Sequence, residues 1–237
     1  MQTRRERVRQ AAIDEIKSIA WEIAREHGME DVTVNGIARR MGMTAPAFYS
    51  YFKSRDELIR ELVIEAYQSF RHTLIIARDS VPESDIAGRI YQVFIAYREW
   101  AVTNASMFGL FAGKPVVGFE SPDPVVIEEA DQVYGVFLML YEEAWQKGII
   151  KTPGEKVDLP DGYVSDLKKV CEQRSLSFSV ELLNLFVKNA LLVHGMISME
   201  LSGRFSDLAT DRSAFYQFQI LDILKDFGID YTPDDDI

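Results

Sequence analysis

Cysteine and histidine are scarce in this chain of 237 residues. It has one cysteine, Cys171, and three histidines, His27, His72 and His194. A single cysteine excludes an internal disulfide framework and a cysteine-rich zinc or iron–sulfur site, and it favours a reducing, cytoplasmic compartment. The histidines are not paired at the spacing of metal ligands. We therefore expect no metal site and no other cofactor.

Catalytic motifs are missing as well. The sequence has no nucleophile elbow, no glycine-rich loop that would cradle a phosphate and no Cys/His pair close together. Because catalytic groups can also meet only in the folded chain, an enzyme stays open as the less favoured hypothesis. We expect a protein that is not an enzyme.

Long apolar runs are absent too. A membrane helix needs roughly 18 or more apolar residues, whereas the longest uncharged stretch, residues 100–113, is interrupted by Thr103, Asn104 and Ser106. The charged N-terminus is followed by no compact apolar segment of the kind that signal peptides contain. We expect no association with membranes.

Basic residues are outnumbered by acidic ones, 26 to 37, and the net charge is -11. The excess is uneven: residues 1–60 carry 11 Lys+Arg and 9 Asp+Glu, and the other 177 residues carry 15 and 28. A slightly basic segment joined to an acidic body favours contact of the first segment with an anion. The acidic body would be repelled by nucleic acid.

Helical periodicity is what the sequence has in abundance. Apolar residues recur every three or four positions over 12–23, 58–74, 86–101, 133–144 and 215–227. The segment 178–201 has so little polar face that we expect it to be buried on most sides. Proline and glycine in 113–124 and 150–162 predict loops. With no strand alternation of useful length, the sequence predicts an all-α protein of nine or ten helices.

Residues 33–58 are the most informative segment, TVNGIARRMGMTAPAFYSYFKSRDEL. Thr33 can cap a short helix, Gly42 can supply a tight turn, and Thr44 can cap a second short helix. Pro46 falls in the first turn of that second helix, where a missing N–H costs nothing. Two short helices joined at a glycine predict a helix-turn-helix unit.

The second of these helices separates an inner from an outer face. Phe48 and Phe52 are four residues apart and are expected to point inward, which leaves small, polar and aromatic residues outside. A helix with small leading residues can approach the floor of the DNA major groove closely. The segment is therefore typical of a DNA-reading helix.

The spacing of this segment resembles the N-terminal domain of the TetR family of bacterial transcriptional regulators. The matching residues are Thr33, Ile37, Ala38, Gly42, Met43, Thr44, Phe48, Tyr49, Tyr51, Phe52, Lys53, Ser54 and Leu58. Residues 190–201 are similar to the WHG-type C-terminal ligand domain of some members. Val193 stands where that motif has tryptophan, directly before His194 and Gly195.

The resemblance implies a domain organisation and a function. We expect a helix-turn-helix domain over 1–54, a helical effector-binding and dimerisation domain over 55–232, and an acidic tail over 233–237. The implied protein is a cytoplasmic, nucleoid-associated homodimer that binds a palindromic operator in double-stranded DNA. As a repressor it would be released by a small hydrophobic or aromatic effector. Regulation by a protein partner instead of a small ligand is the alternative.

The same resemblance implies which residues meet DNA. They are Arg4, Arg5, Thr33, Thr44, Ala45, Pro46, Ala47, Tyr49, Ser50, Tyr51 and Lys53. Hydroxyls and the lysine suit phosphates, which set register, and the alanines suit thymine methyls. No Arg or Lys stands on the outer face, so DNA shape would contribute to specificity. Alternatively, the tyrosines cover helix packing, and the basic residues belong to a solvated surface.

The implied effector contacts are aromatic, methionine and histidine side chains. They are Phe94, Tyr97, Trp100, Met107, Phe108, Phe111, Tyr134, Phe137, Tyr141 and His194. Each can equally be plain core, and only their number favours a pocket. The glycine after His194 favours close helix packing as the other explanation of that motif.

The last two predicted helices, 178–201 and 213–227, would pair with their copies as a four-helix dimer interface. That arrangement is implied by the family. The interface residues that we expect are Phe186, Leu191, Gly195, Phe218, Leu221 and Leu224.

Overall fold

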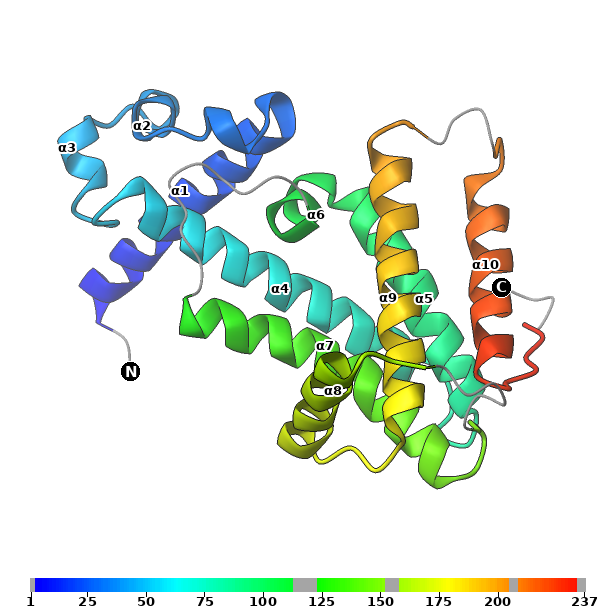
Figure 1. Ribbon diagram of the computed structural model, residues 1–237. Helices are drawn as coiled ribbons and strands as arrows, with labels where there is room; N and C mark the ends of the chain where they lie inside the picture. The colour runs from blue at the N-terminus through cyan, green and yellow to red at the C-terminus, as the bar shows by residue number, and fades with distance from the viewer. Residues whose placement is uncertain (1–2, 113–122, 152–157, 205–208, 234–237) are drawn as a thin grey trace. The chain divides into compact units, whose positions relative to one another are not determined.

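The computed structural model describes residues 3–112, 123–151, 158–204 and 209–233 (Figure 1). Within these ranges the chain forms ten α-helices and a short 3-10 helix, η1, and it has no strand, which confirms the all-α prediction. The elements are α1 (Arg4–His27), η1 (Met29–Asp31), α2 (Val34–Met41), α3 (Ala45–Phe48), α4 (Arg55–Asp79), α5 (Ile86–Thr103), α6 (Ala105–Ala112), α7 (Pro124–Gln146), α8 (Asp161–Arg174), α9 (Val180–Leu201) and α10 (Arg212–Asp226).

Side chains cap the first turns of several helices. At α1, the Thr3 hydroxyl accepts a hydrogen bond from the Glu6 N–H at 3.3 Å, and the Glu6 carboxylate accepts one from the Thr3 N–H at 2.7 Å. The Ser54 hydroxyl accepts from the Glu57 N–H at 3.0 Å at the start of α4. Such caps satisfy N–H groups that the first turn of a helix leaves unpaired.

Parts of the predicted loops and tail fall beyond the structural description. Residues 113–122 and 152–157, within the two expected loops, lie outside the described residues, as do 234–237 of the expected acidic tail. The helix α8 was not predicted from the sequence. Its apolar positions are few, and Leu167 is its buried residue.

The chain packs as two compact units that are not continuous in sequence. The first, which we call the head unit, comprises residues 1–69 and 103–131, and the second, the body unit, comprises 70–102 and 132–237. Both α4 and α7 pass from one unit into the other. The expected boundary at residue 54 is a functional one and stays a prediction.

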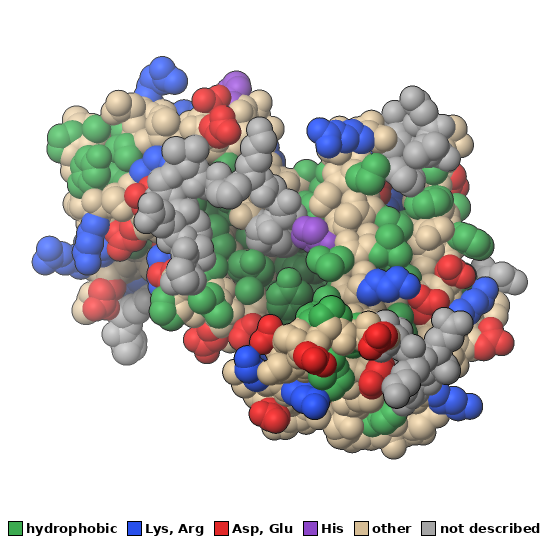
Figure 2. All heavy atoms as spheres, viewed as in Figure 1, with side chains coloured by type: hydrophobic (Ala, Val, Ile, Leu, Met, Phe, Trp, Pro, Cys, Tyr) green, Lys and Arg blue, Asp and Glu red, His purple; other side chains and the backbone are tan. Residues whose placement is uncertain are grey.

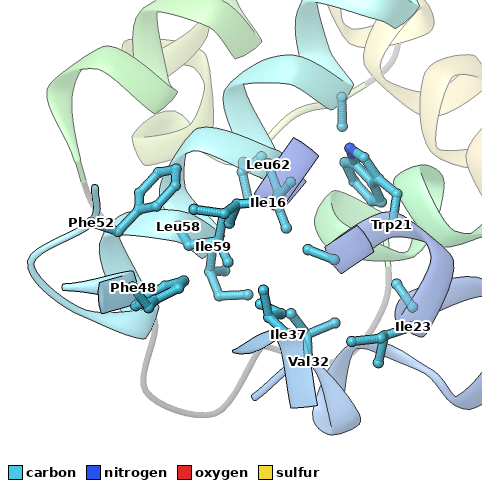
Figure 3. Close-up of a cluster of buried hydrophobic side chains, with 14 of the residues drawn as sticks. Ile16, Trp21, Ile23, Val32, Ile37, Phe48, Phe52, Leu58, Ile59 and Leu62 are labelled. Atoms are coloured by element: carbon cyan, nitrogen blue, oxygen red, sulfur yellow. The ribbon is translucent and has the colours of Figure 1, made fainter. Parts of the chain in front are cut away.

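The head unit is built around a hydrophobic core to which each of its first helices contributes. Side chains from α1, α2, the segment after η1, the α3 region and α4 point toward one another (Figure 3). Val126 of α7 joins this core, and Met107 and Leu110 of α6 pack against it. Each large apolar side chain removed from water contributes about 1.5–3 kcal/mol. The labelled core residues are Ile16, Trp21, Ile23, Val32, Ile37, Phe48, Phe52, Leu58, Ile59 and Leu62.

Polar contacts attach the start of α7 to the head unit. The Arg60 guanidinium donates to the Asp123 carboxylate at 2.6 Å, and the other oxygen of that carboxylate accepts from the Val125 N–H at 2.8 Å. Gln68 donates to Glu129, 9% exposed, at 2.7 Å. The arginine lowers the pKa of Asp123, chiefly by its hydrogen bond. The first turns of α7 therefore belong to the same packed unit as the helix-turn-helix.

The body unit has an aromatic core formed by α5, α7, α9 and α10. The rings of Phe94 and Phe137 lie 5.3 Å apart between centroids. The Tyr141 ring contacts Phe186 at 5.2 Å and Phe227 at 4.6 Å, both edge to face. Edge-to-face pairs of this kind stabilise a core by more than the burial of their apolar area alone would.

One face of α9 is exposed, contrary to the expectation that this helix is buried on most sides. Leu191 is 69% exposed, Leu192 44% and Met199 43%. Among the described helices, α9 has the length and composition of a membrane-crossing helix, which core helices of soluble proteins also have. Its opposite face packs inside the body unit, where Phe186 and Val193 are buried. An apolar helix face that remains exposed in a folded unit is typical of a surface that is covered by a partner.

Candidate functional site

The helix-turn-helix is capped as its sequence predicts. The Thr33 hydroxyl accepts from the Gly36 N–H at 3.1 Å, and the Thr44 hydroxyl accepts from the Ala47 N–H at 3.4 Å. Gly42 ends α2 with φ 66°, a left-handed conformation that glycine adopts without strain. Each threonine oxygen accepts a bond and keeps its own proton, which can be donated to a phosphate oxygen.

The face of α3 that would meet DNA is small and partly exposed. Ala45 and Ala47 are half-buried, Pro46 is exposed, and Tyr49 is 54% exposed with its ring edge-on to Phe48. The neighbouring phenylalanine has no exposed surface, so it anchors the short helix in the head core. This places small side chains outside and a large one inside, as close approach to a groove requires.

Ser50 is one of the predicted DNA contacts, and its hydroxyl can form a hydrogen bond with a base edge. It is exposed, but its hydroxyl donates to the Ala47 carbonyl at 2.7 Å. With its proton engaged, this hydroxyl retains lone pairs and can act as an acceptor. A donor group such as a cytosine or adenine amine is therefore its matching partner in the groove.

Tyr51 is joined by an arginine that was not among the predicted contact residues. The Arg9 guanidinium lies 5.6 Å from the centroid of the Tyr51 ring, and it donates to the Tyr51 carbonyl at 3.5 Å. The sequence signal was the basic run at the start of α1, in which Arg4 and Arg5 are also exposed. Lys53 is exposed directly after this segment. The structure thus brings Arg9 and Tyr51 together across 42 positions.

Two arginines fix the motif in the head unit. Arg55 donates from Nε to the Val32 carbonyl at 2.5 Å and from Nη2 to the Met29 carbonyl at 3.1 Å, which holds the start of α4 to the turn before α2. Arg40 of α2 pairs with Glu26 of α1. That hydrogen bond lowers the pKa of Glu26 and raises the pKa of Arg40.

The predicted effector residues fall in both units. Met107 and Phe108 lie on α6 in the head unit, where Phe108 is buried. Tyr134 on α7 is 53% exposed, and the side chain of Phe111 lies outside the described residues. Tyr134 belongs to the body unit, as do the remaining predicted residues Phe94, Tyr97, Trp100, Phe137, Tyr141 and His194.

Within the body unit, all of these remaining side chains except Tyr141 form one connected cluster. Phe70 of α4 stacks on Trp100 at 4.6 Å between centroids and contacts Tyr97 at the same distance. The Tyr97 hydroxyl and His194 Nδ1 share a hydrogen bond of 2.7 Å. Phe70 was part of the predicted α4 periodicity but not of the predicted site. An apolar cluster with few polar groups is typical of sites for small ligands.

His194 makes the stability of the body unit depend on pH, and its pKa decides the direction of that dependence. Burial lowers its pKa below the ordinary value of 6.5. The unfolded chain therefore takes up a proton at a higher pH than the folded chain. The contribution of neutral His194 to stability is present above pH 6.5 and is lost as the pH falls through the folded-state pKa. We expect His194→Gln, which keeps a hydrogen-bonding side chain, to flatten the loss of stability between about pH 7.5 and pH 5.5 in urea denaturation.

The matched control for this experiment is His72→Gln, because His72 is exposed on α4. It should leave the pH dependence of the parent unchanged. An identical slope in the parent and in His194→Gln would contradict the assignment to His194.

A separate, open cleft of about 580 Å³ lies in the body unit. Its lining comes from the ends of α4 and α8, the segment before α5, α5 itself and the C-terminal half of α7. It mixes apolar, basic and acidic side chains. None of the predicted effector residues with a described side chain lines it. The residues are Arg78, Asp79, Glu83, Arg89, Gly135, Leu138, Met139, Leu140, Glu142, Glu143, Gln146, Arg174, Ser175 and Leu176. Sequence spacing could not indicate a cleft assembled from such distant segments.

The predicted dimer residues divide into exposed and buried sets. Leu191 on α9 is 69% exposed, and Phe218 on α10 is 61% exposed. Gly195 and Leu221 are half-buried, whereas Phe186 and Leu224 lie inside the unit. Hydrophobic side chains are visible on the surface over α9 and α10 (Figure 2). In the part of the chain that the structure describes, no group of three or more His, Cys, Asp or Glu side chains could hold a metal ion.

Two family models match this chain, one over the helix-turn-helix and the other over most of the body unit. Residues 16–62 match the family described as bacterial regulatory proteins, tetR family. Residues 90–223, more than half of the chain, match the tetracyclin repressor-like C-terminal domain. The second match contains the His194–Gly195 segment that is similar to the WHG-type domain.

Individual relatives agree with these family matches. The HTH-type transcriptional regulator Rv1816 of Mycobacterium tuberculosis is 28% identical over 223 residues, which cover 92% of this chain and 94% of the relative. The crystal structure of the regulatory protein SCO4313 is 30% identical, with a TM-score of 0.74, and the match covers 94% of this chain and 100% of that one. A tetR-family regulatory protein from Rhodococcus RHA1 shares the fold, with a TM-score of 0.63 at 17% identity over 92% and 97% of the two chains.

The prediction of a DNA-binding regulator and not an enzyme is confirmed by these matches. The chain belongs to the TetR family of bacterial transcriptional regulators.

Proposed function

We propose that this regulator is a homodimeric repressor that binds a palindromic operator and is released by a small, mainly apolar effector. It would act in the cytoplasm, at the nucleoid. The observation that carries the proposal is the exposed apolar face of the body unit, with Leu191, Leu192 and Met199 on α9 and Phe218 on α10. A second copy of the chain would cover this face, and the two head units of the dimer would bind one DNA duplex.

The head unit supports operator binding through complementary chemistry. Exposed hydroxyls at Thr33 and Thr44 and the exposed Lys53 suit phosphate oxygens. The small residues of α3 suit the floor of the major groove. A two-fold dimer that reads DNA in this way recognises half-sites about one helical turn apart.

The aromatic cluster of the body unit supports the response to an effector. An effector bound among Tyr97, Phe137 and His194 would change the packing of α5, α7 and α9. Both α4 and α7 pass from the body unit into the head unit. A change in the packing of either helix would therefore shift the conformational equilibrium of the head unit.

The proposal is tested by titrating the purified protein onto labelled DNA that flanks its own gene. Fluorescence anisotropy at two salt concentrations separates specific binding from the electrostatic attraction that any DNA exerts. A site bound well above competitor DNA, and released by a small compound, is the expected result. Binding that no small compound weakens but that a protein partner abolishes would contradict the effector response and favour the alternative.

Removing single phosphate contacts should weaken binding to all sequences alike. We expect Tyr49→Ala and Lys53→Ala each to lower operator affinity about 5–10-fold, and Lys53→Ala to reduce the salt slope by about one. Lys169→Ala, at an exposed lysine on α8, is the matched control. Size-exclusion chromatography should give the same oligomer for all of these variants. Parental affinity in both head variants would show that the reading face is placed wrongly.

A further inference from the structure

Two hydrogen-bond donors in the aromatic core of the body unit have no partner within the described part of the chain. Tyr141 is 1% exposed and Asn189 is 2% exposed. Neither the Tyr141 Oη nor the Asn189 Nδ2 makes a hydrogen bond with any residue that the structure describes. Buried polar groups are nearly always paired, because an unpaired one loses its bonds to water without replacement. Two such groups in one core therefore require an explanation.

Both donors belong to the same stretch of core, between α7 and α9. The Tyr141 ring packs against Phe186 of α9, and Asn189 follows Phe186 by about one helical turn. One turn before Tyr141 on α7, Phe137 contacts Tyr97, which is hydrogen-bonded to His194 of α9. Along α9, Asn189 therefore lies between Phe186, which contacts Tyr141, and His194, which is hydrogen-bonded to Tyr97.

Of the ionisable side chains on α9, Glu200 is paired and His194 is neutral. The ion pair between Arg98 and Glu200, with side chains 14% and 11% exposed, neutralises itself through two hydrogen bonds of 2.6 and 2.8 Å. Burial lowers the pKa of His194, so its ring is neutral at neutral pH. A charged ligand in this core would lose its hydration without gaining a partner of opposite charge.

We propose that Tyr141 and Asn189 are the polar contacts of the effector, and that the effector is a neutral, mainly apolar molecule with a carbonyl-type acceptor oxygen. The inference rests on the proposed effector response and specifies its chemistry. Both groups are donors without acceptors, so an acceptor oxygen on the ligand satisfies them. The aromatic rings around them bind the apolar remainder.

The test uses the purified protein of 237 residues and two matched series of probes. Alkyl phenyl ketones of increasing chain length are each paired with the alkylbenzene of the same length, so that the members of a pair differ by one carbonyl oxygen. Because the donors are buried, the protein is incubated overnight with each probe before binding is measured by calorimetry. Benzoylpropionate, a ketone that also carries a carboxylate, tests the exclusion of charge.

At the chain length that binds best, the ketone should bind about tenfold more tightly than its hydrocarbon partner, as expected for one or two satisfied hydrogen bonds. Benzoylpropionate should bind more weakly than the neutral ketone. Tyr141→Phe and Asn189→Leu should each reduce the preference for the ketone, and together they should abolish it. Tyr163→Phe, which removes the hydroxyl of a half-buried tyrosine on α8, should leave the preference unchanged.

A measurement without any probe provides a second test. If the Tyr141 hydroxyl is unpaired in the empty protein, Tyr141→Phe should raise the Tm by about 2–4 °C. A lower Tm would show that the hydroxyl already has a partner, and it would overturn the assignment. Equal binding of ketones and hydrocarbons, or no binding of any ketone, would overturn it as well.

Anisotropy with operator DNA separates this inference from the proposed function. If a compound without an acceptor releases the DNA and no ketone is preferred, the effector response stands and the donor assignment falls. If ketones are preferred through Tyr141 and Asn189 but leave DNA affinity unchanged, the donor site stands and the effector response falls.

Discussion

Replacing Leu191 by glutamate is expected to convert the dimer into monomers and to lower operator affinity by about 10²–10⁴-fold. Leu191 is 69% exposed on α9, within the apolar face that we assign to the second copy. By two-fold symmetry the substitution places two carboxylates in one apolar interface, where each loses hydration without gaining a cation. A monomer binds only one half-site. It therefore loses the gain in affinity that comes from linking two binding events.

Sedimentation velocity measures the oligomer, and anisotropy measures operator affinity, on the same preparation. Ile76→Glu is the control, because Ile76 is 56% exposed on α4 in the body unit and lies outside α9 and α10. It should remain dimeric with parental affinity. A Leu191→Glu protein that is still dimeric would show that the copies meet at another surface.

Replacing Arg98 by methionine is expected to destabilise the body unit by about 3–5 kcal/mol. The substitution leaves the Glu200 carboxylate 11% exposed and without its guanidinium. It also removes the cation that lies 5.7 Å from the centroid of the Tyr216 ring. That ring is held in turn by the hydrogen bond from its hydroxyl to the Phe94 carbonyl, at 2.9 Å. Arg98 thus joins α5 to both α9 and α10.

The double variant Arg98→Met/Glu200→Leu identifies the cause of that loss. When both charges are replaced by apolar side chains of similar size, most of the stability should return, because no unpaired charge is left in the core. Urea denaturation followed by circular dichroism measures the free energy of unfolding of each variant. If the double variant is as unstable as Arg98→Met, the side chains stabilise the unit through packing and not through their charges.

The helix-turn-helix could be predicted because its signals are local. Thr33, Gly42 and Thr44 act within a few residues of themselves, as a cap, a left-handed turn and a second cap. Phe48 and Phe52 share a helix face by spacing alone, and their rings stack at 5.7 Å. Caps, turns and faces are properties of neighbouring residues, so the sequence contains them directly.

The body unit could be predicted only in outline, because helical spacing defines a face but not the partner of that face. Tyr134 and Tyr141 both lie on α7, yet the first is 53% exposed and the second 1%. On α10 the predicted interface residue Leu224 is fully buried, whereas Phe218 is 61% exposed. Asn189 is a polar residue within an apolar helix, and spacing alone does not show whether it is buried. Its burial and missing partner depend on contacts between helices distant in sequence.

The passage of α4 and α7 through both units has a consequence for building chimeric regulators. A transplant of residues 1–54 alone would leave Leu58 and Leu62 of α4 and Val126 of α7 behind, although all three complete the head core. It would also leave behind the pair of Arg60 and Asp123. A new operator specificity is therefore better introduced by exchanging the exposed residues of α3 within this scaffold than by exchanging whole domains.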